Sequence, residues 1–217
     1  MTVVQLNKNY DGVKKQMQYL QNHVVAVETF FNRVAPELDK LSDIYVSALQ
    51  NGNKLLFCGN GGSAADAQHM AAEFVGRFLE DRKSLPAIAL TTDTSNLTAI
   101  ANDYGYDQVF SRQIEGLGVE GDILMGITTS GNSENILKAF EVAKEKGIIT
   151  VALTGKSGGA AKEMADHEFT VDTNYTPHIQ ECHIMCLHLL CALIEEKMGL
   201  VPSSIQNTEK EVIAKIS

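Results

Sequence analysis

Short apolar runs alternate with amphipathic segments along most of this chain. The runs are too short for typical helices and are bounded by turn residues, so each is typical of a strand buried on both faces. They occupy residues 55–58, 87–90, 122–127, 148–153 and 168–171. Segments with helical spacing follow several of them. This alternation predicts an α/β fold, a doubly wound five-stranded parallel sheet flanked by helices.

The region before the first strand has a different pattern, with apolar residues at helical spacing over residues 10–51. Pro36 either separates two helices or kinks one. An apolar helix in this position has little to bury against within one sheet, so we interpret it as an oligomer contact in preference to a lid on the core. The chain then divides into a helical oligomerisation arm at 1–52, an α/β domain at 53–199 and a loosely held polar tail at 200–217.

The first strand leads into a glycine-rich turn, Gly59-Asn60-Gly61-Gly62. The residues that follow, Ser63-Ala64-Ala65-Asp66, have the spacing of a capping box, which predicts that a helix begins at Ser63. Backbone N–H groups and the positive end of the helix dipole then point at one spot. Such a spot suits an anion, most often a phosphate.

A second loop of this kind follows the third strand. It contains four hydroxyl side chains, Thr128, Thr129, Ser130 and Ser133. Ligands of open parallel sheets bind at the carboxyl ends of the strands, so the two loops together favour a phosphorylated ligand. Ser133 also has a simpler interpretation as a helix cap, and both interpretations can hold for that residue.

Two helices carry candidate metal ligands. His69 and Glu73 are four residues apart and therefore lie on one face of the helix after the glycine turn. Gln180 and His188 border the apolar stripe of the last helix. If the two helices meet, these side chains form a nitrogen and oxygen set suited to zinc or another divalent first-row ion. The alternative is that Glu73 is an exposed helix carboxylate without a ligand.

The last helix leaves two questions open. Glu181 shares a face with His188 better than Gln180 does, and periodicity alone cannot choose between them. His183 lies on the other side of the stripe from His188, and we interpret it as a core histidine with a satisfied hydrogen bond.

Composition narrows the possible functions. The net charge of −9 and the pI near 5.1 argue against a nucleic-acid-binding surface. No apolar run approaches the length of a membrane span, and the first residues lack the order of a signal peptide. Four cysteines without CxxC spacing indicate reduced core thiols and a cytoplasmic protein.

Several stretches in register carry a resemblance to a known family. They read CGNGGSAADAQHMAAEFVGRF, LPAIALTTDTSNLTAIANDYGYD, ITTSGNSENILKA, VALTGKSGG and IQECHIMCLH. Together they resemble the sedoheptulose-7-phosphate isomerases (phosphoheptose isomerases), a branch of the SIS-domain (sugar isomerase) proteins. The similarity runs from about residue 55 to about residue 198. It implies a five-stranded parallel sheet and a homotetramer with sites at subunit boundaries.

The resemblance also implies an activity, the conversion of D-sedoheptulose 7-phosphate to D-glycero-D-manno-heptose 7-phosphate. This is the first step of the bacterial ADP- or GDP-heptose synthesis that serves lipopolysaccharide, capsule or S-layer glycans. The implied ligands of one divalent ion, usually Zn²⁺, are His69, Glu73, Gln180 and His188. The implied substrate contacts are Asn60, Gly61, Gly62, Ser63, Asn102, Asp103, Thr128, Thr129, Ser130, Ser133 and Gln180. One departure is that Pro177 and His178 stand where many members have an aspartate and an arginine, which bears on contacts to the sugar hydroxyls.

Isomerisation of a ketose to an aldose needs a base, an acid and stabilisation of an enediol. Our hypothesis is that Glu73 is the base, that His188 is the acid and that a divalent ion stabilises the enediol. The alternative function is a non-catalytic SIS-domain tetramer that binds a replication-initiator protein. The histidine at position 188 distinguishes the two, because the binding proteins lack it.

Overall fold

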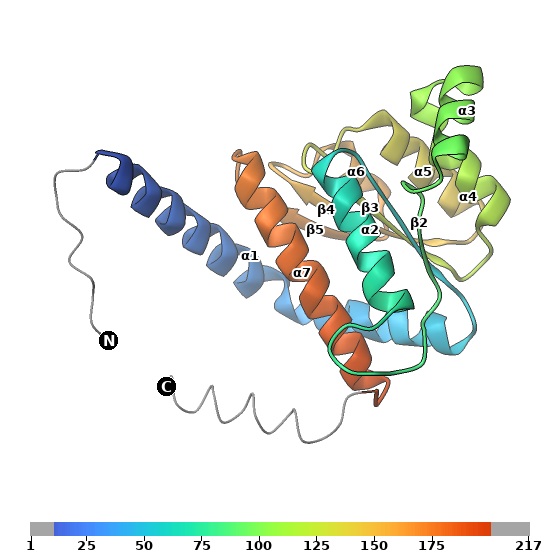
Figure 1. The fold of residues 1–217 in the computed structure, drawn as a ribbon, viewed down its shortest axis with the longest axis horizontal. Coiled ribbons are helices and arrows are strands. Elements are labelled where there is room, and N and C mark those ends of the chain that lie inside the picture. Colours follow the sequence, from blue (N-terminus) through green and yellow to red (C-terminus); the bar gives the residue numbers. More distant parts are fainter. Residues whose placement is uncertain (1–10, 201–217) are drawn as a thin grey trace.

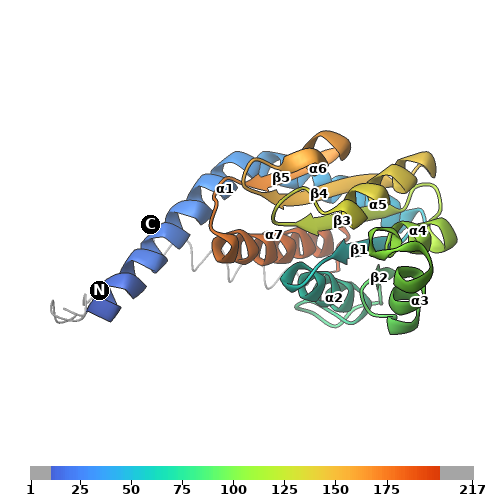
Figure 2. The same ribbon diagram turned by 90° about the horizontal axis from the view of Figure 1, so that it is seen from above.

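A five-stranded parallel sheet with the strand order β2-β1-β3-β4-β5 forms the centre of this computed structural model, which describes residues 11–200. The strands are β1 (Leu55–Gly59), β2 (Ala87–Ala89), β3 (Ile123–Thr128), β4 (Ile149–Gly155) and β5 (His167–Val171). Helices cover both faces of the sheet (Figure 1 and Figure 2). The predicted doubly wound α/β fold is therefore confirmed.

Two helical layers bury the two faces of the sheet. The helices are α1 (Asp11–Gln50), α2 (Gly62–Val75), α3 (Thr94–Tyr104), α4 (Ser111–Leu117), α5 (Glu134–Glu145), α6 (Gly159–Met164) and α7 (Thr176–Lys197), with the short 3-10 helix η1 (Tyr106–Gln108) between α3 and α4. Leu55 and Phe57 of β1 enter the core formed with α1, α2 and α7, whereas Leu56 and Cys58 enter the core formed with α4, α5 and α6. Successive residues of one strand are thus buried in different cores, which explains its unbroken apolar run.

The strand order reverses between β1 and β3. The chain leaves β1 for β2 at one side and returns to β3 on the other side. In open α/β sheets, ligands bind in the crevice outside the carboxyl ends of the strands at such a reversal. Here the glycine turn follows β1 and the hydroxyl-rich loop follows β3, so both border that crevice.

Helix α1 is continuous, and Pro36 lies inside it. Its C-terminal half packs against α7 and β5, with an almost fully buried stripe of Phe30, Val34, Leu38, Leu41 and Tyr45. The expectation that this segment has little to bury against within its own chain is wrong for this half, because α1 covers apolar surface that α7 leaves open. The N-terminal half extends away from the sheet (Figure 1) and exposes Met17, Leu20, Val24 and Val25. It still contacts the beginning of α7 through Tyr19 and His23. Residues 1–10 of the predicted arm and 201–217 of the predicted tail lie outside the described residues.

Helix α7 is long and apolar enough to cross a membrane by length and composition alone, which the sequence analysis did not anticipate. Half of its apolar window is buried inside the molecule. Its buried residues, among them Ile179, Leu187 and Ile194, belong to the core shared with α1 and α2. This burial is typical of the core helix of a globular domain.

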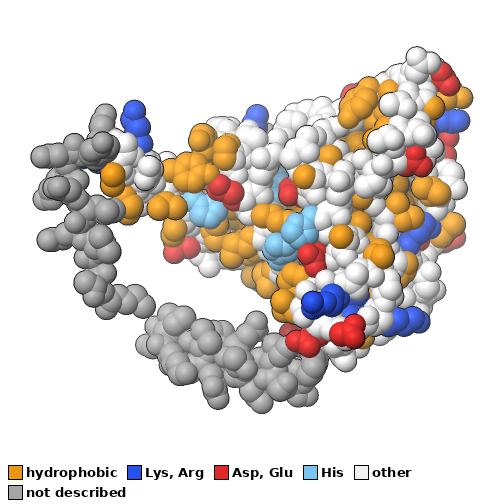
Figure 3. All heavy atoms as spheres, viewed as in Figure 1, with side chains coloured by type: hydrophobic (Ala, Val, Ile, Leu, Met, Phe, Trp, Pro, Cys, Tyr) orange, Lys and Arg blue, Asp and Glu red, His pale blue; other side chains and the backbone are white. Residues whose placement is uncertain are grey.

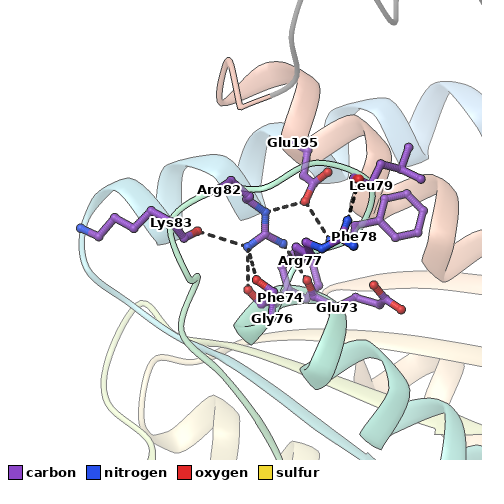
Figure 4. Close-up of polar contacts among 9 residues, drawn as sticks. All are labelled: Glu73, Phe74, Gly76, Arg77, Phe78, Leu79, Arg82, Lys83 and Glu195. Atoms are coloured by element: carbon purple, nitrogen blue, oxygen red, sulfur yellow. Dashed lines mark hydrogen bonds and ion pairs between the residues drawn. The ribbon is translucent and has the colours of Figure 1, made fainter.

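A buried ion pair joins the segment after α2 to the end of α7. Nε of Arg82 lies 2.5 Å from Oε1 of Glu195, and the side chains are only 2% and 1% exposed. The same guanidinium donates to the carbonyl oxygens of Glu73 and Phe74 at 2.6 and 2.8 Å (Figure 4). These carbonyls end α2 and have no intrahelical partner, so Arg82 both caps α2 and holds it beside α7.

Replacing Arg82 by Met should lower the free energy of unfolding by about 3–5 kcal/mol, because the Glu195 carboxylate would stay buried without its counter-ion. Urea denaturation followed by circular dichroism measures this. Lys40→Met is the matched control, since Lys40 pairs with Glu37 on the surface, where the side chains are 70% and 62% exposed. The control should change stability far less. Equal losses in both variants would contradict a structural role for the buried pair.

Candidate functional site

The turn after β1 places the N-terminus of α2 against α7. Gly61 has a φ of 57°, in the left-handed region that favours glycine, and occupies the N-cap of α2. A Cβ on Gly62 would lie 2.5 Å from Nε2 of Gln180, so a side chain there would displace that amide. At the start of α2 the N–H groups of Ser63 and Ala64 donate to the carbonyl oxygens of Asn60 and Gly61 at 3.0 and 3.1 Å. The N–H group of Gly62 has no acceptor among the described residues, so it and the positive end of the helix dipole are available to an anion.

The prediction that Ser63 caps α2 in a capping box is wrong. Helix α2 begins at Gly62, and Gly61 at the N-cap provides no side-chain hydrogen bond. Ser63 instead lies in the first turn and is buried. The glycine conformation, which the capping rule does not consider, decides where this helix starts.

The hydroxyl groups of the loop after β3 gather at one point. Oγ1 of Thr128 lies 3.1 Å from Oγ of Ser133 and 3.4 Å from Oγ of Ser130. Ser133 occupies the N-cap of α5, but its side chain makes no capping hydrogen bond. Its hydroxyl is therefore directed to the other hydroxyls of the loop, as a binding site requires. Thr129 lies between them in the same loop and is half-buried.

Two side chains that the sequence analysis missed, Asn135 of α5 and Tyr106 of η1, contact Asn60 of the glycine turn. Asn60 and Asn135 exchange two amide hydrogen bonds, each 2.9 Å long. The hydroxyl of Tyr106 also donates to Oδ1 of Asn60 at 3.2 Å. The sequence could have suggested Asn135, because it is a polar residue in the first turn of the helix that follows the hydroxyl-rich loop. No sequence signal pointed to Tyr106.

Three of the four predicted metal ligands meet where α2 and α7 lie side by side (Figure 1). Nε2 of His69 lies 2.9 Å from Oε1 of Glu73 and 3.3 Å from Nε2 of His188. One ligand atom from each residue lies within 4.8 Å of the others. Histidine side chains are visible at the surface over these helices (Figure 3), so the group opens to solvent. Two imidazoles and one carboxylate match the three protein ligands and open position of many catalytic zinc sites.

Periodicity could not choose between Gln180 and Glu181 as the residue that faces α2, and the structure makes that choice. The amide of Gln180 lies against Gly62, beside the glycine turn. The carboxylate of Glu181 points instead to α1, where it contacts His23 at 2.8 Å. His183 is fully buried, and its Nε2 lies 2.9 Å from the carbonyl oxygen of Thr154. Burial lowers the pKa of His183 to about 4. The core position of this residue is confirmed, but its hydrogen bonding is satisfied at one nitrogen alone, because Nδ1 is buried without a partner among the described residues.

Asn102 and Asp103 lie in the last turns of α3, at the surface. Nδ2 of Asn102 donates to Oδ1 of Asp103 at 2.7 Å. Within the part of the chain that the structure describes, neither side chain bonds to the glycine turn or to the hydroxyl-rich loop.

Comparison with known proteins gives consistent matches. The family model for the SIS domain matches residues 18–155. A phosphoheptose isomerase from Nitratiruptor sp. is 52% identical over 184 residues, which cover 83% of this chain and 98% of that protein. Phosphoheptose isomerase 2 from Campylobacter jejuni is 57% identical over 153 residues, covering 70% of this chain and 76% of that protein.

Two solved structures match in fold as well as in sequence. A phosphoheptose isomerase from Neisseria gonorrhoeae has a TM-score of 0.80 at 41% identity, covering 84% of this chain and 98% of that one. One from Francisella tularensis has a TM-score of 0.83 at 40% identity, covering 86% and 100%. The non-catalytic alternative gains no support from these relatives. Because the identity extends over nearly the whole length of such relatives, this chain belongs to the phosphoheptose isomerases of the SIS-domain family and is a sugar-phosphate isomerase of heptose synthesis.

Proposed function

We propose that this protein converts D-sedoheptulose 7-phosphate to D-glycero-D-manno-heptose 7-phosphate at the crevice between α2, α7 and the two loops. The observation that carries the proposal is the convergence of His188 of α7 with His69 and Glu73 of α2, the helix whose N-terminus adjoins the glycine turn. A carboxylate and two imidazoles, with His69 in contact with both of the others, offer the acid and base groups that a ketose–aldose isomerisation needs.

The loops are proposed to bind the phosphate end of the substrate. The N–H group of Gly62, the positive end of the α2 dipole and the hydroxyls around Thr128 attract the phosphate without any lysine. The distance along α2 from Gly62 to His69 is about 10 Å at 1.5 Å per residue. The sugar chain therefore lies along this helix, with its phosphate near Gly62 and its reacting carbons near His69. The full set of proposed contacts is Asn60, Gly61, Gly62, Ser63, Asn102, Asp103, Thr128, Thr129, Ser130, Ser133 and Gln180.

Proton transfer is assigned to two side chains of the cluster. Glu73 removes a proton from C1 of the ketose and returns it to C2, which gives the aldose. His188 moves a proton between the oxygens on C1 and C2, so that the proton count is unchanged overall. His69 contacts both side chains and orients them. Glu73 keeps its position because Arg82 binds its backbone carbonyl (Figure 4).

His69, Glu73 and His188 fit a divalent ion, proposed to be Zn²⁺. Gln180 is the proposed fourth ligand, and its amide, which lies beside Gly62 in this structure, would have to turn toward the other three. Such an ion supplies a Lewis acid that polarises the sugar carbonyl and stabilises negative charge on an enediol. Because Glu73 and His188 are proposed both as ligands and as acid–base groups, removal of either affects both functions.

A homotetramer in the cytoplasm, with sites at subunit boundaries, is proposed from the exposed apolar residues. The projecting half of α1 within the arm at 1–52 and the outer face of α7 carry Met17, Leu20, Val24, Val25, Met185 and Leu189, which are all more than one-third exposed. Contiguous exposed apolar surface of this kind is typical of protein interfaces. The cluster on α2 and α7 opens on a face that a neighbouring subunit could cover.

The direct test is incubation of the protein with D-sedoheptulose 7-phosphate and detection of the aldose by NMR. We expect conversion that stops when a chelator is added and returns when Zn²⁺ is restored. Conversion unaffected by thorough chelation would remove the metal from the proposal. No conversion in the metal-loaded protein would remove the substrate assignment.

Replacing Glu73 by Gln keeps the shape of the side chain but removes its basicity. We expect kcat to fall by about 10²–10⁴-fold, the usual contribution of a positioned base. Size-exclusion chromatography should show an unchanged assembly. The control is Glu37→Gln, which alters an exposed carboxylate on α1 and should leave kcat unchanged. An active Glu73→Gln enzyme would eliminate Glu73 as the base.

Replacing Gly62 by Ala tests the contact between the glycine turn and α7. The new methyl group would displace the Gln180 amide, and we expect kcat/KM to fall by about 100-fold, as misplacement by roughly 1 Å can cost. Gly116→Ala is the matched control, because a Cβ there meets no atom within 4 Å. Thermal unfolding should change little in either variant. Equal activity in both would show that the position of Gln180 does not matter.

A further inference from the structure

A second group of ligand-type side chains lies where α1 crosses the beginning of α7. His23 comes from α1, and His178 and Glu181 come from the first turns of α7. One ligand atom from each lies within 4.8 Å of the others. Figure 3 shows histidine at this junction, apart from the histidines over α2 and α7. We propose that His23, His178 and Glu181 form a second binding site for a divalent first-row metal ion such as Zn²⁺, separate from the isomerase site.

The Nδ1 atoms of His23 and His178 both point at the same carboxylate oxygen of Glu181. Nδ1 of His23 lies 2.8 Å from Oε2 of Glu181, and Nδ1 of His178 lies 2.9 Å from the same oxygen. Nδ1 of His23 is buried, yet its contact with Glu181 does not have hydrogen-bond geometry. A hydrogen-bonded network therefore leaves this nitrogen unsatisfied, and a cation between the three atoms would satisfy it.

The surrounding side chains orient the three ligands. The hydroxyl of Tyr19 donates to Oε1 of Glu181, which leaves Oε2 for the imidazoles. The ring of His178 lies between those of Tyr19 and Tyr175, with centroids 4.5 and 4.7 Å away, and its side chain is only 4% exposed.

The distances require only small side-chain movements. Zinc binds histidine nitrogen and carboxylate oxygen at about 2.0–2.2 Å, so two ligand atoms on one ion are at most about 4.4 Å apart. The three atoms already lie close to that range. A cavity of about 550 Å³ beside them, lined by Tyr19, Tyr175 and His178, provides a path for entry from solvent. The ion would tie α1 to the first turns of α7 through His178 and Glu181, which lie on either side of Gln180 in the sequence.

The test is to measure how many zinc ions the full chain binds. The protein is purified without a histidine tag, loaded with Zn²⁺ and dialysed before the measurement. We expect two ions per chain in the wild type and one in His23→Phe, which keeps a ring but has no donor atom. Glu181→Gln should lose the same ion. The control His167→Gln alters a histidine outside both groups and should keep two. Circular dichroism checks that each variant is folded.

A second experiment distinguishes this site from the proposed isomerase site by using a variant that lacks two ligands of the isomerase site. In the double variant His69→Ala and His188→Ala we expect one ion, which addition of His23→Phe should remove. Visible absorption of bound Co²⁺ should report the same stoichiometries. Metal content unchanged by both His23→Phe and Glu181→Gln would overturn the second site. Loss of one ion in His23→Phe, with no loss in the double variant, would support the second site and contradict the metal in the proposed function.

Discussion

The parallel packing of α2 and α7 on one face of the sheet is the constraint on which the site depends. The two helices run in register: Gly62 meets Gln180, and His69 meets His188. At their far ends, Arg82 joins the last turn of α2 to Glu195 (Figure 4). A shift of one helix by a single turn would move each pair apart by about 5 Å. The buried ion pair and the close approach at Gly62 fix the two ends, so the histidines between them are held in position.

This arrangement separates two kinds of chemistry along one helix. The N-terminus of α2 offers N–H groups and the positive end of a dipole, whereas its middle carries His69 and Glu73. Neutral hydroxyls and amides surround the first region, and ionisable groups form the second. The length of helix between them therefore limits how far a reacting carbon can be from a bound anion.

Much of this could be predicted from the sequence, because it depends on local patterns. The strands and the two loops follow from apolar runs and turn residues, whereas the order of the strands in the sheet was not predicted. The pairing of His69 with Glu73 follows from helical spacing. The start of α2 was mispredicted because the capping rule considers Ser63 and ignores the left-handed conformation of Gly61.

Contacts between distant segments could not be predicted in the same way. The choice between Gln180 and Glu181 depends on the rotation of α7, which its packing against α1 determines. The burial of the second half of α1 depends on how much of the sheet α7 leaves uncovered. The pair of Arg82 and Glu195 joins residues more than a hundred positions apart, and neither lies in a recognisable motif.

The continuity of α1 has a mechanical consequence. One uninterrupted helix extends from the projecting N-terminal part to Tyr45 and Leu49 in the core, passing His23 at the beginning of α7. Pro36 removes one backbone hydrogen bond from this helix, but it lies on the core side of His23. The segment from the outer end to the junction with α7 keeps its backbone hydrogen bonds, so a force applied to the outer end acts as on a lever whose fulcrum is that junction. Whatever holds the outer end still therefore also limits the movement of the helix that carries Gln180 and His188.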